Sequence, residues 1–152
     1  MSIAIATEAD IPALCHLLGY LFAQEAEFEA DIEAQQQGLK MIIRSPQVGT
    51  ILLSRQQGRI VGMVSLLYSV STALGGRVCM LEDMVVAPEY RRLEDGSHIG
   101  TELLEQAVVY ARQQGVLRIT LLTDDDNIAA QRFYQRQGFH FSTMQAMRKS
   151  LV

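Results

Sequence analysis

The chain has 152 residues, of which 49% are hydrophobic and 20% are charged, and its formal net charge is −4. A chain of this length buries most of its apolar surface without disulfides or metal, so we expect a single domain over residues 1–152. The negative charge argues against nucleic acid as the main partner, and no apolar run approaches the ~20 residues that cross a membrane. The two widely spaced cysteines, Cys15 and Cys79, and the lack of a signal-peptide pattern in the first residues predict a reduced, cytoplasmic protein.

The first part of the chain predicts a strand followed by two helices. Residues 2–6 alternate like a strand, and Thr7 with Asp10 three residues later forms a capping-box pattern for the helix that follows. A second helix is expected from about Asp31, behind acidic residues that begin at Glu25. These acidic residues either attract a cationic acceptor or form a solvated helix face, and the sequence leaves both interpretations open.

Three strands without intervening helices come next. They are expected over residues 50–55, 59–70 and 78–86, with turns at residues 56–58 and 73–76. Parallel neighbours need a crossover of roughly a dozen residues, so these strands cannot all be parallel. The sheet is therefore mixed.

The third of these strands leads into the longest helix through a charged turn. From Gly100 the apolar residues change to a helical period, and Gly115 marks the end of the helix. The first N–H groups of a helix have no partner, and the helix macrodipole is positive there. The turn before Gly100 therefore predicts an anion site that suits phosphate.

The last part of the chain predicts a strand over residues 117–122, a helix that begins at Asp126 or Asn127 and ends at Gly138, and a terminal strand or pair of strands over residues 139–142 and 144–149. The order of elements, β-α-α-β-β-β-α-β-α-β-β, predicts an α+β fold of the α/β-sandwich type. His16, His98 and His140 show no metal-ligand spacing, so no metal is expected.

Two stretches carry a family resemblance. The stretch VVAPEYRRLEDGSHIGTELLEQAVVYAR resembles the acyl-CoA motif of the GCN5-related N-acetyltransferase (GNAT) family, whose core reads Q/R-x-x-G-x-G/A. Arg91 stands for the basic position and Gly100 for the last glycine, with four extra residues between them and His98 at the first-glycine position. The stretch LLTDDDNIAAQRFYQRQGFHF resembles the second motif, with matches at Asn127, Ala130, Phe133, Tyr134, Gly138 and Phe139.

The resemblance implies a GNAT-like acyl-CoA N-acyltransferase fold, with a mixed, mostly antiparallel sheet of six to seven strands and helices on both faces. It also implies that two strands diverge to admit the pantetheine arm of acetyl-CoA, which pairs with the backbone like an added strand. The residues that it assigns to the cofactor are Met84, Val85, Val86, Arg91, Arg92, His98, Ile99, Gly100, Thr101, Asn127 and Ala130. Among these, His98 is either a phosphate contact or a solvated loop residue, and Asn127 also suits a helix cap.

Acetyl transfer to an amine needs a base, because a free alkyl amine titrates near ~10.4. Glu82 is the candidate, since it interrupts an apolar strand on the face expected for Met80 and Met84. The structural alternative is a carboxylate paired with Arg77 or Arg118.

The departing thiolate needs a proton, and the resemblance assigns the general acid to Tyr134. A phenol near ~10 matches a thiol near ~8.5. The structural alternative is a core tyrosine that only satisfies its hydroxyl.

The sequence thus predicts an acetyl-CoA-dependent N-acetyltransferase that transfers the acetyl group directly to a primary amine, with a small molecule as the expected acceptor. One alternative is an enzyme that acetylates a protein N-terminus or lysine. Another is a non-catalytic acyl-CoA-binding module. Neither nucleic acid nor a membrane is an expected partner, and a homodimer is compatible with the resemblance because dimers are common in that family.

Overall fold

The computed structural model describes residues 2–24, 31–92 and 98–152 of the chain. These residues form two compact units, Met1–Leu121 and Leu122–Val152, which we describe separately. The acidic residues between Glu25 and Glu29 and the middle of the turn at Gly96 and Ser97, which the sequence analysis singled out, lie outside the described residues.

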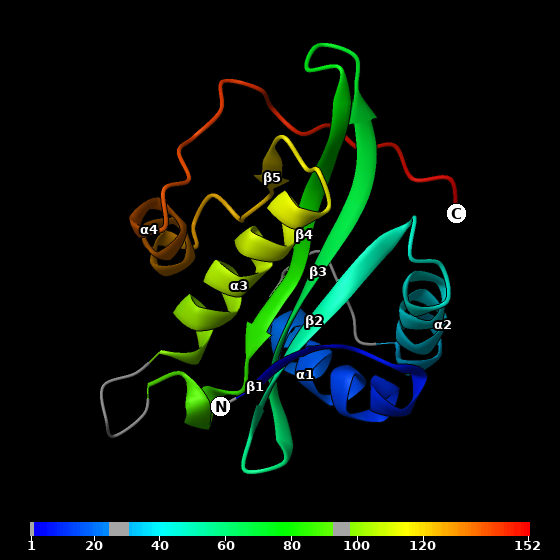
Figure 1. The fold of residues 1–152 in the computed structure, drawn as a ribbon. Coiled ribbons are helices and arrows are strands. Elements are labelled where there is room, and N and C mark those ends of the chain that lie inside the picture. The colour runs from blue at the N-terminus through cyan, green and yellow to red at the C-terminus, as the bar shows by residue number, and fades with distance from the viewer. Residues whose placement is uncertain (1, 25–30, 93–97) are drawn as a thin grey trace. The chain divides into compact units, whose positions relative to one another are not determined.

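The first unit is a twisted five-stranded sheet in the order β1-β2-β3-β4-β5 (Figure 1). Its neighbours are antiparallel from β1 to β4, whereas β4 and β5 are parallel, so the prediction of a mixed, mostly antiparallel sheet is confirmed. Hairpins join the three central strands, and Gln57 and Gly58 both have positive φ, as the tight turn between β2 and β3 requires. The strands are β1 Ser2–Ile5, β2 Gly49–Gln56, β3 Arg59–Ser71, β4 Gly76–Val86 and β5 Ile119–Leu121.

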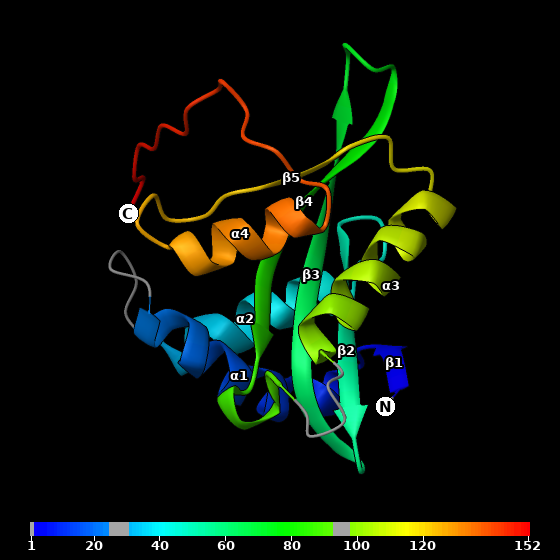
Figure 2. The ribbon, with the colours of Figure 1, turned by 90° about the vertical axis from the view of Figure 1, so that its left-hand side faces the viewer.

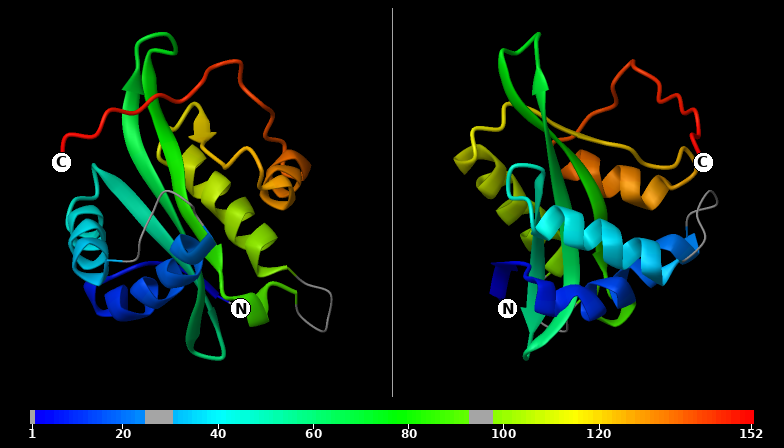
Figure 3. Two further views of the ribbon diagram at one scale, coloured as in Figure 1. Left: turned by 180° about the vertical axis from the view of Figure 1, so that it is seen from behind. Right: turned by 90° about the vertical axis from the view of Figure 1, so that its right-hand side faces the viewer.

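Helices cover both faces of this sheet. Figure 2 shows α1 and α2 on one side of the strands and α3 on the other, and Figure 3 shows α1 and α2 lying across their shared face. The core between α1, α2 and the sheet includes Leu14, Leu39, Leu53 and Met63, all nearly inaccessible to solvent. The helices are α1 Ile11–Gln24, α2 Ile32–Ile43 and α3 Ile99–Gln113, with short 3-10 helices η1 Glu8–Asp10 and η2 Pro88–Tyr90.

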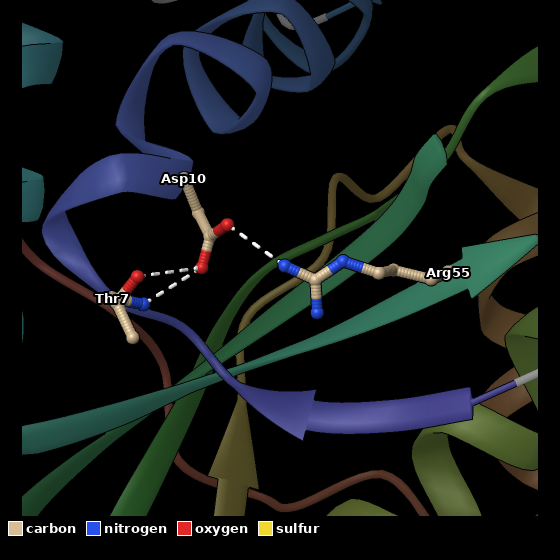
Figure 4. Close-up of polar contacts among 3 residues, drawn as sticks. All are labelled: Thr7, Asp10 and Arg55. Atoms are coloured by element: carbon tan, nitrogen blue, oxygen red, sulfur yellow. Dashed lines mark hydrogen bonds and ion pairs between the residues drawn. The ribbon is translucent and has the colours of Figure 1, made fainter. Parts of the chain in front are cut away.

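The start of α1 is tied to the sheet through Asp10 (Figure 4). Its carboxylate accepts hydrogen bonds from the backbone N–H of Thr7 at 2.8 Å and from the Thr7 hydroxyl at 3.2 Å. The other carboxylate oxygen accepts from the Arg55 guanidinium of β2 at 2.9 Å. The predicted capping pair is therefore confirmed, and it continues into an ion pair that sequence spacing did not indicate.

The second unit contains one helix, α4 Ile128–Arg136. Asn127 caps it by accepting a hydrogen bond from the N–H of Ala130 at 3.1 Å, and Gly138 follows its end with φ +94°. Both helix signals were predicted correctly.

The prediction of terminal strands is wrong, and the expected six to seven strands become five in the described residues. Residues 139–142 and 144–149 form no strand, although their apolar side chains alternate. A strand needs a neighbour for its N–H and C=O groups and a face to bury. Within its own unit the segment has neither, and Phe141, Met144 and Met147 remain 64%, 86% and 94% exposed.

Candidate active site

At its C-terminal end, β4 extends beyond β5, its parallel neighbour in the sheet. β5 pairs with β4 only from Cys79 to Leu81, and the strand then continues over residues 82–86. In the described part of the first unit no strand pairs with this outer side, which we call the open edge of β4. An extended ligand that pairs with this edge would bind as an added strand does.

The direction of the backbone groups at this edge follows from the ladder. The N–H of Ala87 donates to the carbonyl of Val61 at 2.8 Å, so Ala87 is directed toward β3. Antiparallel ladder bonds alternate from one residue to the next, so Val86 directs its N–H and C=O away from β3. The same alternation directs Met84 to the open edge and Val85 toward Met63, its partner on β3. Of the three predicted backbone contacts, Met84 and Val86 are therefore at the open edge.

Arg91 lies beside the end of this strand. Its Nε donates to the carbonyl of Val86 at 3.1 Å. The residue before it, Tyr90, packs against the core and lies under the guanidinium of Arg59, whose central carbon is 5.7 Å from the ring centroid. These contacts hold the start of the predicted phosphate turn, where Arg91 and Arg92 are both exposed.

The start of α3 offers backbone donors that have no partner within the helix. Its N-cap residue His98 makes no side-chain cap, and the first helical hydrogen bond runs from the N–H of Glu102 to the carbonyl of His98 at 3.1 Å. The N–H groups of Ile99, Gly100 and Thr101 consequently have no partner within the helix. An anion bound here would meet three donors and the positive end of the helix dipole.

Packing joins these two backbone sites. Ile99 is fully buried and forms a small core with Val61 of β3 and Val86 of β4. Gly62 makes this contact close, because a Cβ there would lie 3.4 Å from side-chain atoms of Leu103 and Val86. The open edge of β4 and the donor groups of α3 are thus held at fixed positions in one unit.

Glu82 lies on the sheet face that α1 and α2 cover. Its partner across the ladder is Ser65, and the neighbouring pairs on that face are Leu67 with Met80 and Met63 with Val85. The Glu82 side chain is exposed, beside the apolar layer rather than within it. The expected cost of a buried carboxylate therefore does not arise.

A β-bulge changes the predicted faces near Glu82. Two residues, Asp83 and Met84, stand opposite the single residue Val64, and Asp83 has φ +51°. The bulge directs Met84 to the face opposite Glu82, so the prediction that both share one face with Met80 is wrong for Met84. Simple alternation fails at an inserted residue.

No ion pair of Glu82 occurs among the residues that the structure describes. Ion pairs in the first unit include Arg44 with Glu8 and Arg55 with Asp10. Arg77, one of the partners considered for Glu82, instead lies over the ring of Tyr68, 4.6 Å from its centroid. Glu82 is left with its carboxylate available to a ligand.

Tyr134 belongs to the second unit, where it packs against two aromatic rings. Its ring centroid lies 5.2 Å from that of Phe133 and 5.7 Å from that of Phe139, both edge to face. Burial raises the pKa of Tyr134 to about 12. The phenol therefore keeps its proton at neutral pH and is a weaker acid than a free phenol, further from the thiol pKa near ~8.5. Asn127 and Ala130 are already paired with each other in the helix cap.

Other candidate groups have structural roles. Cys79 is buried in the sheet, and burial raises the pKa of its thiol to about 11, which disfavours a thiolate nucleophile.

Across the described ranges, no group of three or more His, Cys, Asp or Glu side chains could hold a metal ion. No helix in those ranges is long and apolar enough to cross a membrane.

Sequence reasoning missed Ser65. Its side chain is fully buried, and its Oγ has no hydrogen-bond partner within the described residues. The available signal was a hydroxyl residue inside the apolar run of β3. Its proximity to Glu82 depends on the strand register, which the sequence does not show.

Comparison with known proteins agrees with this arrangement. The model of the acetyltransferase (GNAT) family matches residues 14–139. An uncharacterized N-acetyltransferase of Bacillus subtilis, YhfO, is 28% identical over 94% of this chain and 92% of its own length. The aminoalkylphosphonate N-acetyltransferase of Salmonella typhimurium is 32% identical over 78% of this chain and 76% of its own.

A crystal structure shows the same fold. The structure of a possible acetyltransferase from Clostridium difficile superposes with a TM-score of 0.86, covering 99% of this chain and 97% of that one at 16% identity. The family model spans most of the chain, including both motifs and the turn into α3. The chain therefore belongs to the GNAT family of acetyltransferases.

Proposed function

We propose that this acetyltransferase uses acetyl-CoA to acetylate the primary amine of a small molecule. The observation that carries the proposal is the open edge of β4 at Met84 and Val86, packed against the first turn of α3, whose leading N–H groups have no partner within the helix. An extended ligand with amide groups at one end and phosphates at the other requires this pair of backbone sites.

The residues fit acetyl-CoA in two places. The N–H groups of Ile99, Gly100 and Thr101 suit the diphosphate, and Arg91, Arg92 and His98 supply further donors from the same turn. The backbone groups of Met84 suit an amide of the pantetheine arm in the manner of an added strand. The Val86 carbonyl accepts from Arg91, so Val86 offers its N–H, which suits the carbonyl of the thioester. When bound, acetyl-CoA supplies the acetyl thioester.

Glu82 takes the proton of the amine in this proposal. A primary amine titrates near ~10.4 and arrives as an ammonium ion, so the exposed Glu82 carboxylate first accepts one proton, which frees the nitrogen lone pair to form the N–C bond to the acetyl group. The second nitrogen proton passes to solvent as the C–S bond breaks. The N–H of Val86, directed to the open edge, suits the carbonyl oxygen on which negative charge develops.

Tyr134 completes the proton balance. As the C–S bond breaks, the sulfur of the leaving thiolate receives the phenol proton, and the phenol regains a proton from solvent. The pKa of about 12 means that Tyr134 begins each turnover protonated. The products are the amide and the free thiol of coenzyme A.

A small-molecule acceptor is supported by the Salmonella relative, whose name gives an aminoalkylphosphonate as its substrate and which matches most of this chain. The relation to that enzyme does not specify which amine is used here. The acceptor class is therefore the first point to test.

The test is thiol release from acetyl-CoA with a panel of small primary amines and a matched panel of peptides with free N-termini or lysines. Faster release with one or more small amines than with any peptide supports the proposal. Turnover of peptides alone would assign the enzyme to protein acetylation. Tight binding of acetyl-CoA with no turnover would instead indicate a binding module.

A further inference from the structure

The Ser65 hydroxyl is an unusual group in the core of the first unit. The residue is 0% exposed, and its Oγ has no hydrogen-bond partner in the part of the chain that the structure describes. Burying a hydroxyl without a partner is unfavourable, so such a group points to a partner that is acquired in another state.

The neighbours of Ser65 identify that partner. On the same face of β3 the flanking side chains are Met63 and Leu67, and across the ladder on the β2 side lies Ile51. On the β4 side lies Glu82. Glu82 is thus the polar side chain among the strand neighbours that share the face of Ser65.

The register brings the two side chains within reach. Cys79 donates its N–H to the carbonyl of Arg118 on β5, so by alternation Glu82 bonds to β3 and faces Ser65 as a hydrogen-bonded pair. The Cβ atoms of such a pair are about 5.5 Å apart. This separation is within the reach of a glutamate side chain.

We propose that Ser65 is a positioning residue for Glu82, on the basis of the proposed function in which Glu82 is the base. The serine hydroxyl donates a hydrogen bond to one carboxylate oxygen of Glu82 when the amine is bound. A carboxylate has two acceptor oxygens, so the other oxygen remains for the amine proton. This contact holds Glu82 in one orientation, although its side chain is otherwise exposed.

The test is a double-mutant cycle on kcat, with the small amine that gives the fastest thiol release. Ser65→Ala is expected to lower kcat about tenfold with little change in KM, because it removes orientation of the base and no contact to the amine. In a Glu82→Gln background, Ser65→Ala is expected to change kcat less than twofold, because its effect passes through Glu82. Ser65→Cys keeps the size of the side chain with a much weaker donor, and we expect it to behave like Ser65→Ala.

Ser54→Ala is the matched control. Ser54 is also 0% exposed with an unpartnered Oγ, but it pairs with Gly62, which faces Leu103 and Ile99 of α3 on the other face of the sheet. We expect Ser54→Ala to leave kcat unchanged, and neither serine variant to lower the melting temperature. Equal losses in kcat from both serine variants would overturn the proposal.

The remaining outcomes separate the proposal from the function on which it rests. A loss from Ser65→Ala that persists in full in the Glu82→Gln background would overturn the role of Ser65 and leave the enzyme assignment intact. Wild-type protein that turns over no small amine would overturn the proposed function, and this proposal with it.

Discussion

At the scale of single residues, the two proposed catalytic groups differ in their surroundings. Glu82 is exposed beside an apolar layer, whereas Tyr134 is packed between Phe133 and Phe139. Burial raises the pKa of Tyr134 to about 12, so the phenol holds its proton at neutral pH. Solvent reaches the Glu82 carboxylate, so an amine can approach it.

Replacing Glu82 by Gln removes the base and keeps the size of the side chain. We expect kcat/KM for the amine to fall about 10²-fold, the lower end of the contribution of a general base. Thiol release under limiting amine measures this. Glu105→Gln, an exposed change on α3, is the control and should have no effect. Wild-type rates in Glu82→Gln would remove the base from the mechanism.

Tyr134 gives a prediction about pH. Because burial raises its pKa to about 12, phenolate absorbance in the wild type minus that in Tyr134→Phe should show a component that titrates near 12. Between pH ~10 and ~12 the unfolded chain loses this proton and the native protein retains it, so the free energy of unfolding should fall over that range. A component near pH ~10 would show that the phenol is not buried.

At the scale of elements, the start of α1 depends on one carboxylate. Asp10 accepts two hydrogen bonds from Thr7 and pairs with Arg55 of β2, so it connects the helix cap to the sheet (Figure 4). The side chain of Asp10 is 11% exposed and that of Arg55 is 35% exposed. Both the cap and a partly desolvated ion pair are lost if this carboxylate is removed.

We expect Asp10→Ala, which removes both the cap acceptor and the ion pair, to lower the free energy of unfolding by about 2 kcal/mol, less than a fully buried pair because Arg55 is partly solvated. Urea denaturation measures the change. Arg44→Met, which breaks the exposed ion pair with Glu8, is the control, and we expect no measurable change from it. Equal effects of the two substitutions would contradict a special role for Asp10.

Two glycines in different elements give opposite predictions for the same change. At Gly49, the first residue of β2, a Cβ would lie 2.6 Å from the backbone oxygen of Leu66, which cannot move without disturbing the ladder. Gly49→Ala should therefore destabilise the protein by about 1–3 kcal/mol. At Gly19, within α1, no atom lies within 4 Å of such a Cβ, so Gly19→Ala should stabilise by about 0.5–1 kcal/mol. Melting temperatures that move in the same direction would contradict the packing at Gly49.

At the scale of the whole molecule, local signals predicted most of the fold. Helix ends at Gly115 and Gly138 and the cap at Asn127 depend on a few neighbouring residues, and the structure confirms all three. The prediction of terminal strands failed because an alternation of apolar and polar residues shows only that a segment can become a strand. Whether it pairs depends on another segment, which the pattern does not contain.

In the candidate site, too, local features were predicted and features that depend on strand register were not. The turn into α3 and the strand end at Val86 followed from local period and from the family motif. The bulge at Asp83 did not, because an extra residue in one strand is defined only by the register with its partner. Ser65 was missed for a similar reason, since an unpartnered hydroxyl becomes visible only when its neighbours are known.

The account depends on acetyl-CoA occupying the open edge of β4 and the start of α3. Amide hydrogen exchange, resolved by residue and measured with and without coenzyme A, tests this directly. We predict added protection at Met84, Val86 and residues 99–101, with little change at Val85, whose amide is already directed toward β3. If coenzyme A binds but amide exchange at Met84, Val86 and residues 99–101 stays unchanged, the account is contradicted.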